Sequence, residues 1–215
     1  MLAKGAEAHV YYGLWITRPA IMKLRVPKKW RCPELDLRLR QLRTKLEAKL
    51  LSSAKKAGVY APTVLYVSLK NTYLIIEFID GLLLRDALIN KVLSRTEARE
   101  IARRVGIFTA RLHRNGLIHG DLTTSNIIVY KGKPVLIDFG LGDFSTTLED
   151  KGTELVVFEK SLMSIHYDMY EELWNAFIEG YSLEYADADI VLKRVKEIKM
   201  RGRYVEERRI KRFRH

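Results

Sequence analysis

The segment 119–142, which reads HGDLTTSNIIVYKGKPVLIDFGLG, decides the fold of this chain. Residues 126–130 are apolar and β-prone, which predicts a short strand. The KGKP sequence at 131–134 is typical of a turn, and residues 134–138 then form a second short strand. The sequence therefore predicts a β-hairpin in the second half of the chain.

Two acidic side chains and one amide lie at the ends of this hairpin. A hairpin brings its ends together, so we expect Asp121, Asn126 and Asp138 to converge at one edge. Their oxygens suit a hard cation such as Mg²⁺, and not zinc. The D-x-x-x-x-N spacing followed by I-D-F-G resembles the catalytic and magnesium loops of protein kinases. Each motif alone occurs by chance, but both in this order, 17 residues apart, predict a phosphoryl-transfer site.

Length and composition set the class of protein. A chain of 215 residues with 47% apolar residues can bury a core, as one domain or as two small lobes. Cys32 is the only cysteine, so no internal disulfide forms and a reducing, cytoplasmic compartment is expected. No apolar run approaches the ~20 residues of a membrane span, so we expect no membrane partner.

The net charge of +12 is concentrated in two segments. Residues 193–215 carry a net charge of +8, and residues 22–49 carry +7. Such concentration indicates an anionic partner, with nucleic acid the first candidate. For residues 22–49, lysines and arginines that solvate a helix face explain the charge equally well.

The first 25 residues are expected to form a short β-meander, with strands at 9–16 and 20–24. In kinases, a glycine-rich turn covers the phosphates of ATP, and a lysine on the following strand binds them. Here Lys23 would be that lysine. The turn has a single glycine instead of G-x-G-x-x-G, and its small residues would let backbone N–H groups approach phosphate oxygens. The turn consists of Lys4, Gly5, Ala6, Glu7 and Ala8.

Residues 33–57 are predicted to form a helix, with leucines at spacings of three and four. Glu47 lies at the margin of this apolar stripe. A kinase requires an acidic helix residue to pair with the strand lysine, and Asp36 lies too near the helix start for that role. Glu47 is therefore the expected partner of Lys23, and a surface Glu in ordinary helix pairs is the alternative.

The next expected elements are a hairpin and then mainly helices. Strands at 64–69 and 73–79 lead to a hinge, where Glu77 and Ile79 would offer backbone groups to an adenine edge. Ser94 and Glu97 form a capping box, which opens a helix to about residue 115. Further helices are expected at 154–165, 168–182 and 187–200. We therefore expect an α+β, small two-lobed protein-kinase-like fold: a β-rich N-lobe at 1–79, a helical, minimal C-lobe at 80–200, and a basic tail at 201–215.

Together, HGDLTTSN, IDFGLG, the EDKG stretch at 149–152 and the basic R-G-R tail resemble one family. It is the kinase/ATPase subunit of the KEOPS complex, an atypical Ser/Thr protein kinase family of the Bud type, here in its archaeal-like, stand-alone form. The resemblance implies Mg²⁺–ATP as cofactor and a role in the threonylcarbamoyladenosine modification of tRNA. It also implies two protein partners, the tRNA threonylcarbamoyltransferase subunit and a small subunit that binds the N-lobe. The basic tail would bind tRNA.

The same resemblance implies individual roles. Asp121 matches the catalytic aspartate, Asn126 and Asp138 match the magnesium ligands, and Lys23 with Glu47 match the phosphate-binding pair. The chain lacks the A-P-E motif and the arginine before Asp121 that ordinary protein kinases have. Those absences leave a protein hydroxyl or water open as the acceptor, so ATP hydrolysis is a plausible working reaction.

Two other classes of protein stay open. A small-molecule kinase of the aminoglycoside or choline type also uses H-G-D and a later Asp, but its larger, acid-lined C-lobe contrasts with this basic C-terminus. A basic RNA-binding scaffold with a vestigial kinase fold would explain the charge. It would leave the conjunction of Lys23, Asp121, Asn126 and Asp138 without a purpose.

Overall fold

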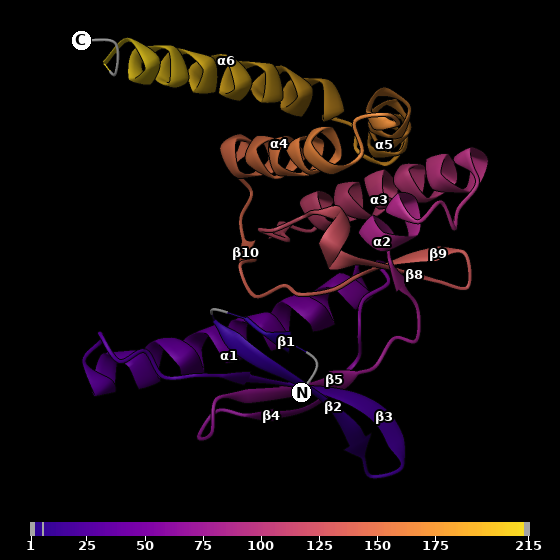
Figure 1. Ribbon diagram of the computed structural model, residues 1–215. Helices are drawn as coiled ribbons and strands as arrows, with labels where there is room; N and C mark the ends of the chain where they lie inside the picture. The colour runs from indigo at the N-terminus through magenta and orange to yellow at the C-terminus, as the bar shows by residue number, and fades with distance from the viewer. Residues whose placement is uncertain (1–2, 6, 213–215) are drawn as a thin grey trace.

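The computed structural model describes residues 3–5 and 7–212. A β-rich part comes first along the chain and a helical part second, which confirms the predicted α+β, kinase-like architecture. The two parts are stacked, with the β-sheet at one end of the molecule and the last helix at the other (Figure 1).

The β-rich part is one antiparallel sheet with the strand order β1-β2-β3-β5-β4. Its strands are β1 (Ala3–Lys4), β2 (Ala8–Trp15), β3 (Arg18–Arg25), β4 (Val64–Ser68) and β5 (Tyr73–Glu77). Strand β3 lies in the middle, paired with β2 along its whole length and with β5 from Ala20 to Leu24. Lys23 thus stands on the central strand, where both neighbours fix its position.

Helix α1 (Pro33–Lys56) coincides with the predicted helix to within one residue. Proline favours the first turn because its missing N–H would have no helical partner there. The helix contacts β4 and β5 on one side, and β7 (Leu117–Ile118) and β10 (Asp143–Phe144) on the other. It therefore lies between the sheet and the helical part (Figure 1).

The predicted hairpin is present as β8 (Ile127–Tyr130) and β9 (Lys133–Leu136), in register from Ile127↔Leu136 to Tyr130↔Lys133. Strand β6 (Leu82–Leu83) pairs with the other edge of β8. A 3₁₀ turn, η1 (Thr124–Asn126), leads into β8. Beyond the hairpin, β10 returns to pair with β7, so the segment between them is closed at its base.

Five helices complete the chain: α2 (Leu84–Ile89), α3 (Arg95–Arg114), α4 (Leu148–Ile165), α5 (Tyr170–Glu184) and α6 (Ala188–Arg212). The predicted capping box of Ser94 and Glu97 opens α3. Helix α4 begins six residues earlier than the predicted 154, because Thr147 caps it at the N–H of Asp150. Helix α6 extends beyond the predicted end at residue 200 and through most of the expected tail. Arg, Lys and Glu are good helix formers, which favours this continuation of the helix. Residues 213–215 lie outside the described residues.

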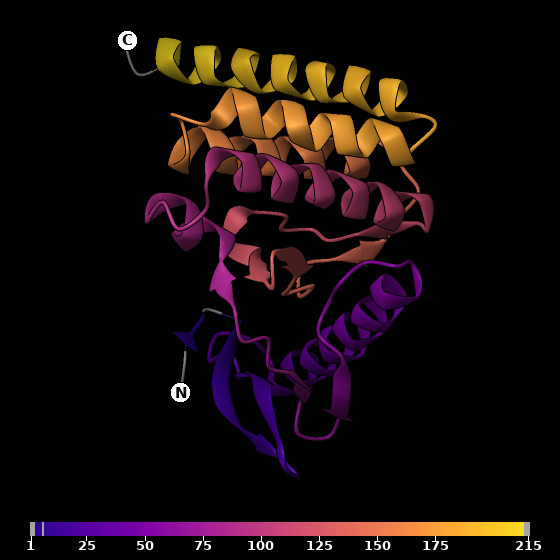
Figure 2. The same cartoon turned by 90° about the vertical axis from the view of Figure 1, so that its right-hand side faces the viewer.

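Helices α3 and α5 cross at two glycines. A Cβ atom on Gly106 would lie 2.0 Å from the carbonyl oxygen of Phe177, and one on Gly180 would lie 1.9 Å from that of Arg103. Only glycine permits such backbone contact. Figure 2 shows α3 as the lowest of the stacked helices, with α6 as the outermost layer.

One hydrophobic core joins the two parts of the molecule. Leu50 and Leu51 of α1 belong to the same buried cluster as Leu122, Phe139 and Phe177 of the helical part. At roughly 25 cal/mol per Å² of buried apolar surface, such a cluster is the main stabilising contribution to the fold. Among the described residues, no helix is both long and apolar enough to span a membrane.

Candidate active site

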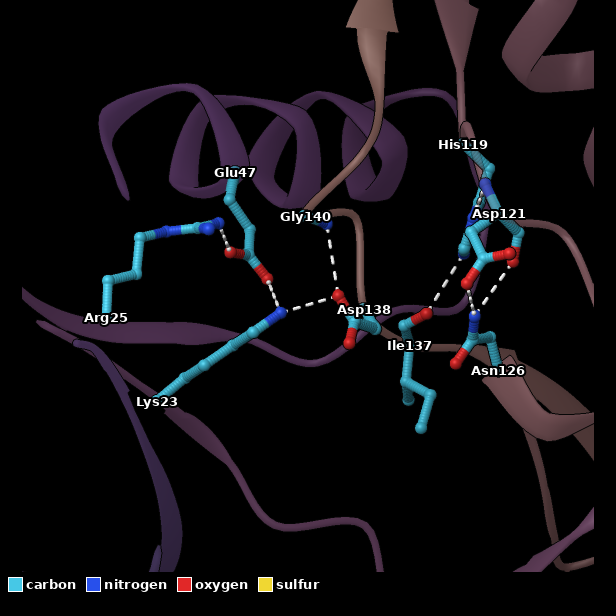
Figure 3. A network of polar contacts seen from close by, with 9 residues as sticks. All are labelled: Lys23, Arg25, Glu47, His119, Asp121, Asn126, Ile137, Asp138 and Gly140. Atoms are coloured by element: carbon cyan, nitrogen blue, oxygen red, sulfur yellow. Dashed lines mark hydrogen bonds and ion pairs between the residues drawn. The ribbon is translucent and has the colours of Figure 1, made fainter. Parts of the chain in front are cut away.

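The β8–β9 hairpin positions Asn126 and Asp138. The backbone N–H of Ile137 donates to the carbonyl oxygen of Asn126 at 2.9 Å, so Asp138 follows directly after the closed end of the ladder. The amide nitrogen of Asn126 donates to the carboxylate and to the carbonyl oxygen of Asp121, both at 2.8 Å (Figure 3). These bonds turn the amide oxygen of Asn126 away from Asp121.

Lys23 connects three parts of the chain that are far apart in sequence. Its Nζ atom lies 2.7 Å from Oε1 of Glu47 on α1 and 2.5 Å from Oδ1 of Asp138 (Figure 3). Glu47 is buried, with only 2% of its side chain exposed, so a charged partner is needed to offset its desolvation. The pairing of Lys23 with Glu47 matches the geometry expected from the sequence.

Burial and charge act in opposite directions on this cluster. Burial, the largest single influence, lowers the pKa of Lys23, but the carboxylates of Glu47 and Asp138 together outweigh it and raise that pKa above its ordinary value. Burial likewise raises the pKa of Asp138, and the ammonium of Lys23 more than compensates, so the net shift of that pKa is downward. Both groups are therefore charged at neutral pH.

The backbone at Asp138 is unusual. Its φ of 62° lies in the left-handed region, which non-glycine residues rarely adopt. The N–H of Gly140 donates to Oδ1 of Asp138 at 3.1 Å, which orients the carboxylate. A Cβ on Gly140 would lie 2.9 Å from that oxygen and 3.1 Å from Nζ of Lys23. Strained backbone held by its surroundings is typical of functional sites.

A cavity of about 320 Å³ lies between the sheet and the ends of the two loops that flank the hairpin, at Asp121 and at 138–141. Residues from both walls line it, including Gly5, Ala8, Lys23, Asp121 and Asp138. The structure thus brings the N-terminal turn, the strand lysine and both acidic residues to one space. The described residues contain no cluster of three or more His, Cys, Asp or Glu side chains suited to a metal ion. The amide oxygen of Asn126 and Oδ2 of Asp138 take no part in the bonds described above. Such a sparse set of oxygen ligands fits Mg²⁺, which keeps several waters or binds phosphate oxygens alongside one or two protein ligands.

The other residues of the predicted turn are placed in part. The N–H of Gly5 donates to the carbonyl oxygen of Ala8 at 3.0 Å, which closes a tight turn. Glu7 forms an ion pair with Arg43 of α1, so its carboxylate is directed toward that helix. Lys4 lies on β1, at the start of the turn. Ala6 lies outside the described residues.

The two expected hinge residues, Glu77 and Ile79, do not line the cavity that contains Lys23 and Asp138. The backbone N–H of Glu77 donates to the carbonyl oxygen of Thr63, and its carboxylate accepts from the Thr63 hydroxyl at 2.7 Å. The carbonyl oxygen of Ile79 accepts from the N–H of Gly81. Both residues line a separate pocket of about 640 Å³, together with Tyr60. Their contact with adenine stays a prediction.

Three residues near the site were not assigned roles from the sequence. Arg25, two residues after Lys23 on β3, donates to Oε2 of Glu47 at 2.5 Å. Buried His119 uses Nε2 to bond the carbonyl oxygen of Ile137 at 2.9 Å, and its Nδ1 accepts from the N–H of Asp121. Buried Glu154 accepts from the N–H of Gly120 at 2.8 Å. Arg25 was detectable, since residues two apart on a strand share a face. Glu154 is 34 residues from its partner, and no local pattern indicates that contact.

Comparison with known proteins gives relatives over nearly the whole chain. A family model described as RIO domain matches residues 27–142, more than half of the chain. The KEOPS complex subunit Bud32 of Pyrococcus abyssi is 38% identical, and the match covers 96% of each chain. Probable bifunctional tRNA threonylcarbamoyladenosine biosynthesis proteins of Methanothermobacter thermautotrophicus and Methanocaldococcus jannaschii are 46% and 37% identical over 96% of this chain. The chain spans 37% of the length of each of these two bifunctional relatives.

These matches agree with the resemblance drawn from the motifs. The matched range contains Glu47, Asp121, Asn126 and Asp138, and it begins after Lys23. The chain therefore belongs to the RIO-domain family, in the group of relatives that contains the KEOPS complex subunit Bud32.

Proposed function

We propose that the chain binds Mg²⁺–ATP in the cavity between the sheet and the loops that flank the hairpin and transfers the terminal phosphoryl group to a hydroxyl. One observation carries this proposal: Lys23 contacts both Glu47 and Asp138. These two residues lie on a helix and a loop that are distant from each other in the sequence. A lysine held in this way presents its charge to the cavity. Phosphoryl transfer needs such positioned charge more than it needs covalent chemistry.

The residues of the cavity divide between phosphate and metal. Lys23 would bind phosphate oxygens, and the turn from Lys4 to Ala8 would offer backbone N–H groups above them. The amide oxygen of Asn126 and the carboxylate of Asp138 would hold Mg²⁺. When bound, the ion neutralises charge on the transferring group and orients it. The left-handed backbone of Asp138 keeps its carboxylate at the cavity wall.

Asp121 would act on the attacking hydroxyl. The hydroxyl oxygen forms a bond to the terminal phosphorus while the bond from that phosphorus to the leaving ADP oxygen breaks. The proton of the hydroxyl passes to the Asp121 carboxylate or to the transferred phosphate. The bond from Asn126 fixes one carboxylate oxygen of Asp121 and leaves the other to face the hydroxyl. A serine or threonine hydroxyl and water are both acceptors of this chemistry.

The adenine would lie toward the connection between the sheet and β6. A hinge recognises adenine through main-chain donors and acceptors, and Glu77 and Ile79 are the proposed contributors. The cavity lining on the other wall includes Val10, an apolar side chain suited to the flat face of a base. We propose that the two lobes of the chain, residues 1–79 and 80–200, form the two walls of the site on either side of this nucleotide.

The names of the relatives support a context for this activity. Bud32 of Pyrococcus abyssi is a KEOPS complex subunit, and the bifunctional relatives act in tRNA threonylcarbamoyladenosine biosynthesis. We propose that this chain works in that process. Its proposed partners are the tRNA threonylcarbamoyltransferase subunit, a small subunit on the N-lobe, and tRNA bound by the basic end of α6. The single free cysteine, Cys32, favours the cytoplasm as the compartment.

The competing small-molecule kinase receives little support from the groove beside the catalytic loop. That groove, about 880 Å³ in volume, is lined by Thr123 and Ser125 and by Lys160 and Lys199 of the helices. Its acidic residue, Glu159, is already bonded to Lys199 at 2.6 Å. A cationic substrate such as an aminoglycoside needs unpaired carboxylates, and this groove offers lysines instead.

Calorimetry with Mg²⁺–ATP, followed by an ATP-turnover assay with and without partner subunits and tRNA, tests the proposal. We expect the isolated chain to bind Mg²⁺–ATP and the Lys23→Met variant to bind it at least about tenfold more weakly, which is about 1.4 kcal/mol. A wild-type chain that binds no nucleotide, with or without its partners, would reject the kinase/ATPase function. It would favour the scaffold alternative.

A further inference from the structure

Glu47 is held by two cations. Lys23 bonds its Oε1 atom at 2.7 Å, and Arg25 bonds its Oε2 atom at 2.5 Å (Figure 3). Both cations are on β3, two residues apart, so their side chains leave the same face of the strand. The side chain of Arg25 is only 4% exposed. A buried arginine is rarely present without a specific anionic partner, and here that partner is Glu47.

Negative charge is in excess around the cavity even when Arg25 is counted. Lys23 and Arg25 are offset by their ion-pair partners Glu47 and Asp138, and Asp121 lines the same cavity. Glu7 also lines it, but is paired with Arg43. Removing Arg25 would increase this excess of negative charge. A negative wall opposes a polyphosphate, and the effect is strong where burial weakens screening. Arg25 also lines the cavity, and its Nη2 lies close to the space beside Gly140.

Arg25 is held in place from behind. Its backbone N–H donates to the carbonyl oxygen of Thr72 at 3.0 Å, and the Thr72 hydroxyl donates to its carbonyl oxygen at 3.2 Å. Buried Thr72 accepts in turn from Nη1 of Arg40 on α1 at 2.7 Å. The strand end that carries Arg25 is therefore tied to the same helix that carries Glu47.

Lys23 and Arg25 differ in whether their side-chain contacts must change when a ligand enters the cavity. Lys23 bonds Asp138 as well as Glu47, so it must rearrange when a phosphate and a metal ion enter the cavity. The guanidinium of Arg25 bonds Glu47 at 2.5 Å and can keep that contact when a ligand enters the cavity.

We propose that Arg25 is a positioning residue of the nucleotide site. It holds the Glu47 carboxylate toward Lys23 and supplies the second positive charge that this wall needs when the nucleotide binds. The inference rests on the proposed function, since it concerns the affinity for Mg²⁺–ATP. It assigns to Arg25 a role that the D-x-x-x-x-N and D-F-G motifs do not contain.

The test compares Arg25→Met, Arg25→Lys and the control Arg111→Met in the full chain. Arg111 is also a partly buried arginine that links separate elements, through Glu184 of α5 and the carbonyl oxygen of Gly58, and none of these contacts involves Glu47 or Arg25. Calorimetry with Mg²⁺–ATP gives Kd, turnover gives kcat and KM, and thermal unfolding without nucleotide gives Tm. We expect Arg25→Met to raise Kd roughly tenfold or more, and Arg25→Lys to stay within about threefold of wild type. Arg111→Met should lower Tm and leave Kd unchanged.

Several outcomes overturn the proposal. If Arg25→Met lowers Tm but binds Mg²⁺–ATP as tightly as wild type, Arg25 has a structural role only. Equal losses of affinity in Arg25→Met and Arg111→Met would mean that general destabilisation, and not the contact with Glu47, is responsible. If Arg25→Met still weakens affinity in a Glu47→Gln background by its full factor, Arg25 does not act through Glu47.

Wild type that binds no Mg²⁺–ATP overturns the proposed function itself, and this inference with it. Intact wild-type binding with an unaffected Arg25→Met overturns the inference alone.

Discussion

The carboxylate of Glu154, on helix α4, accepts a hydrogen bond of 2.8 Å from the backbone N–H of Gly120. Gly120 directly precedes Asp121, so this bond fixes the backbone beside the proposed catalytic carboxylate. The second oxygen of Glu154 bonds Nε2 of buried His113 at 2.9 Å, and Nδ1 of that histidine bonds the hydroxyl of Tyr181. A buried polar chain thus connects helices α3, α4 and α5 to the catalytic loop.

Removing Glu154 should therefore lower both the free energy of unfolding and the rate of turnover. Glu154→Ala leaves the N–H of Gly120 and one nitrogen of His113 buried without a partner, which costs about 2–4 kcal/mol in the free energy of unfolding. Urea unfolding measures this loss. The control is Glu149→Ala on the same helix, whose exposed ion pairs with Arg194 and Arg201 contribute less than ~1 kcal/mol. Equal losses in the two variants would contradict the role of the buried bond.

Asp121 and Asp138 should differ in the step that they serve. Asp138→Ala removes a charged ligand for the metal and should weaken Mg²⁺–ATP binding itself. Asp121→Ala should leave binding nearly intact and lower kcat by a factor of roughly 10²–10⁴ if this residue is the general base. Calorimetry followed by turnover separates the two effects. The assignment is wrong if both variants lose the same affinity.

Lys23 and Glu47 should act as one unit, because their side chains are 2.7 Å apart and Glu47 is buried. Replacing either with alanine should impair the same step, so the double variant should be little worse than the more impaired single variant. Turnover by Lys23→Ala, Glu47→Ala and the double variant completes the cycle. Losses that simply add would show that the two residues work independently.

Acid should destabilise the fold through His119 at mildly acidic pH. Burial lowers the pKa of His119 below its ordinary 6.5, although nearby carboxylates, Glu154 first among them, offset part of that effect. The unfolded chain therefore takes up a proton near pH 6.5, whereas the folded protein does so only at a lower pH. The stability from neutral His119 is present above pH 6.5 and is lost as pH falls through the folded pKa, at about 1.4 kcal/mol per pH unit.

Urea unfolding at a series of pH values between 7.5 and about 5 tests this slope. His119→Gln keeps a donor for the carbonyl oxygen of Ile137 but does not titrate, so its stability should vary less steeply with pH. Burial also lowers the pKa of His166, which contributes in the same window and leaves a residual slope in the variant. Identical slopes for wild type and His119→Gln would exclude His119 as the source.

The basic end of α6 should supply affinity for tRNA. Residues 193–215 carry a net charge of +8, and contact with roughly 5 phosphates would give a log–log salt slope of about −4 to −5. Deleting residues 201–215 should flatten this slope and leave Mg²⁺–ATP affinity unchanged. Filter binding at several salt concentrations measures the slope. A slope that survives truncation would point to a protein partner for the tail instead of RNA.

Local patterns were sufficient to predict much of this fold. The hairpin of β8 and β9, the capping box at Ser94 and the extent of α1 all depend on neighbours within a few residues, so their signals are in the sequence. Apolar periodicity ends near residue 200, so the predicted end of α6 there is too early. The helix continues to Arg212 through residues of good intrinsic helix propensity.

Contacts between distant segments were harder to anticipate. The pairing of Lys23 with Glu47 was predicted only because the kinase motifs indicated that such a pair should exist. The sequence does not single out Arg25, because an arginine on a strand is ordinarily exposed. The burial of Arg25 follows from the position of α1. Glu154 gave no signal in the sequence, because it meets Gly120 through the packing of α4. The hinge at Glu77 and Ile79 uses main-chain atoms, which leave little trace in residue identity.

The pairing of β7 with β10 closes the segment 119–142 into a ring at Ile118 and Asp143. The bond from His119 to Ile137 crosses this ring, so Asp121 and Asp138 cannot separate unless sheet and side-chain bonds break together. Any widening of the cavity must then come from the opposite wall. That wall is attached through α1 as well, whose Leu50 and Leu51 pack in the same core as Leu122 and Phe139. If a nucleotide binds as proposed, its release would require movement at this packed contact and not within the ring.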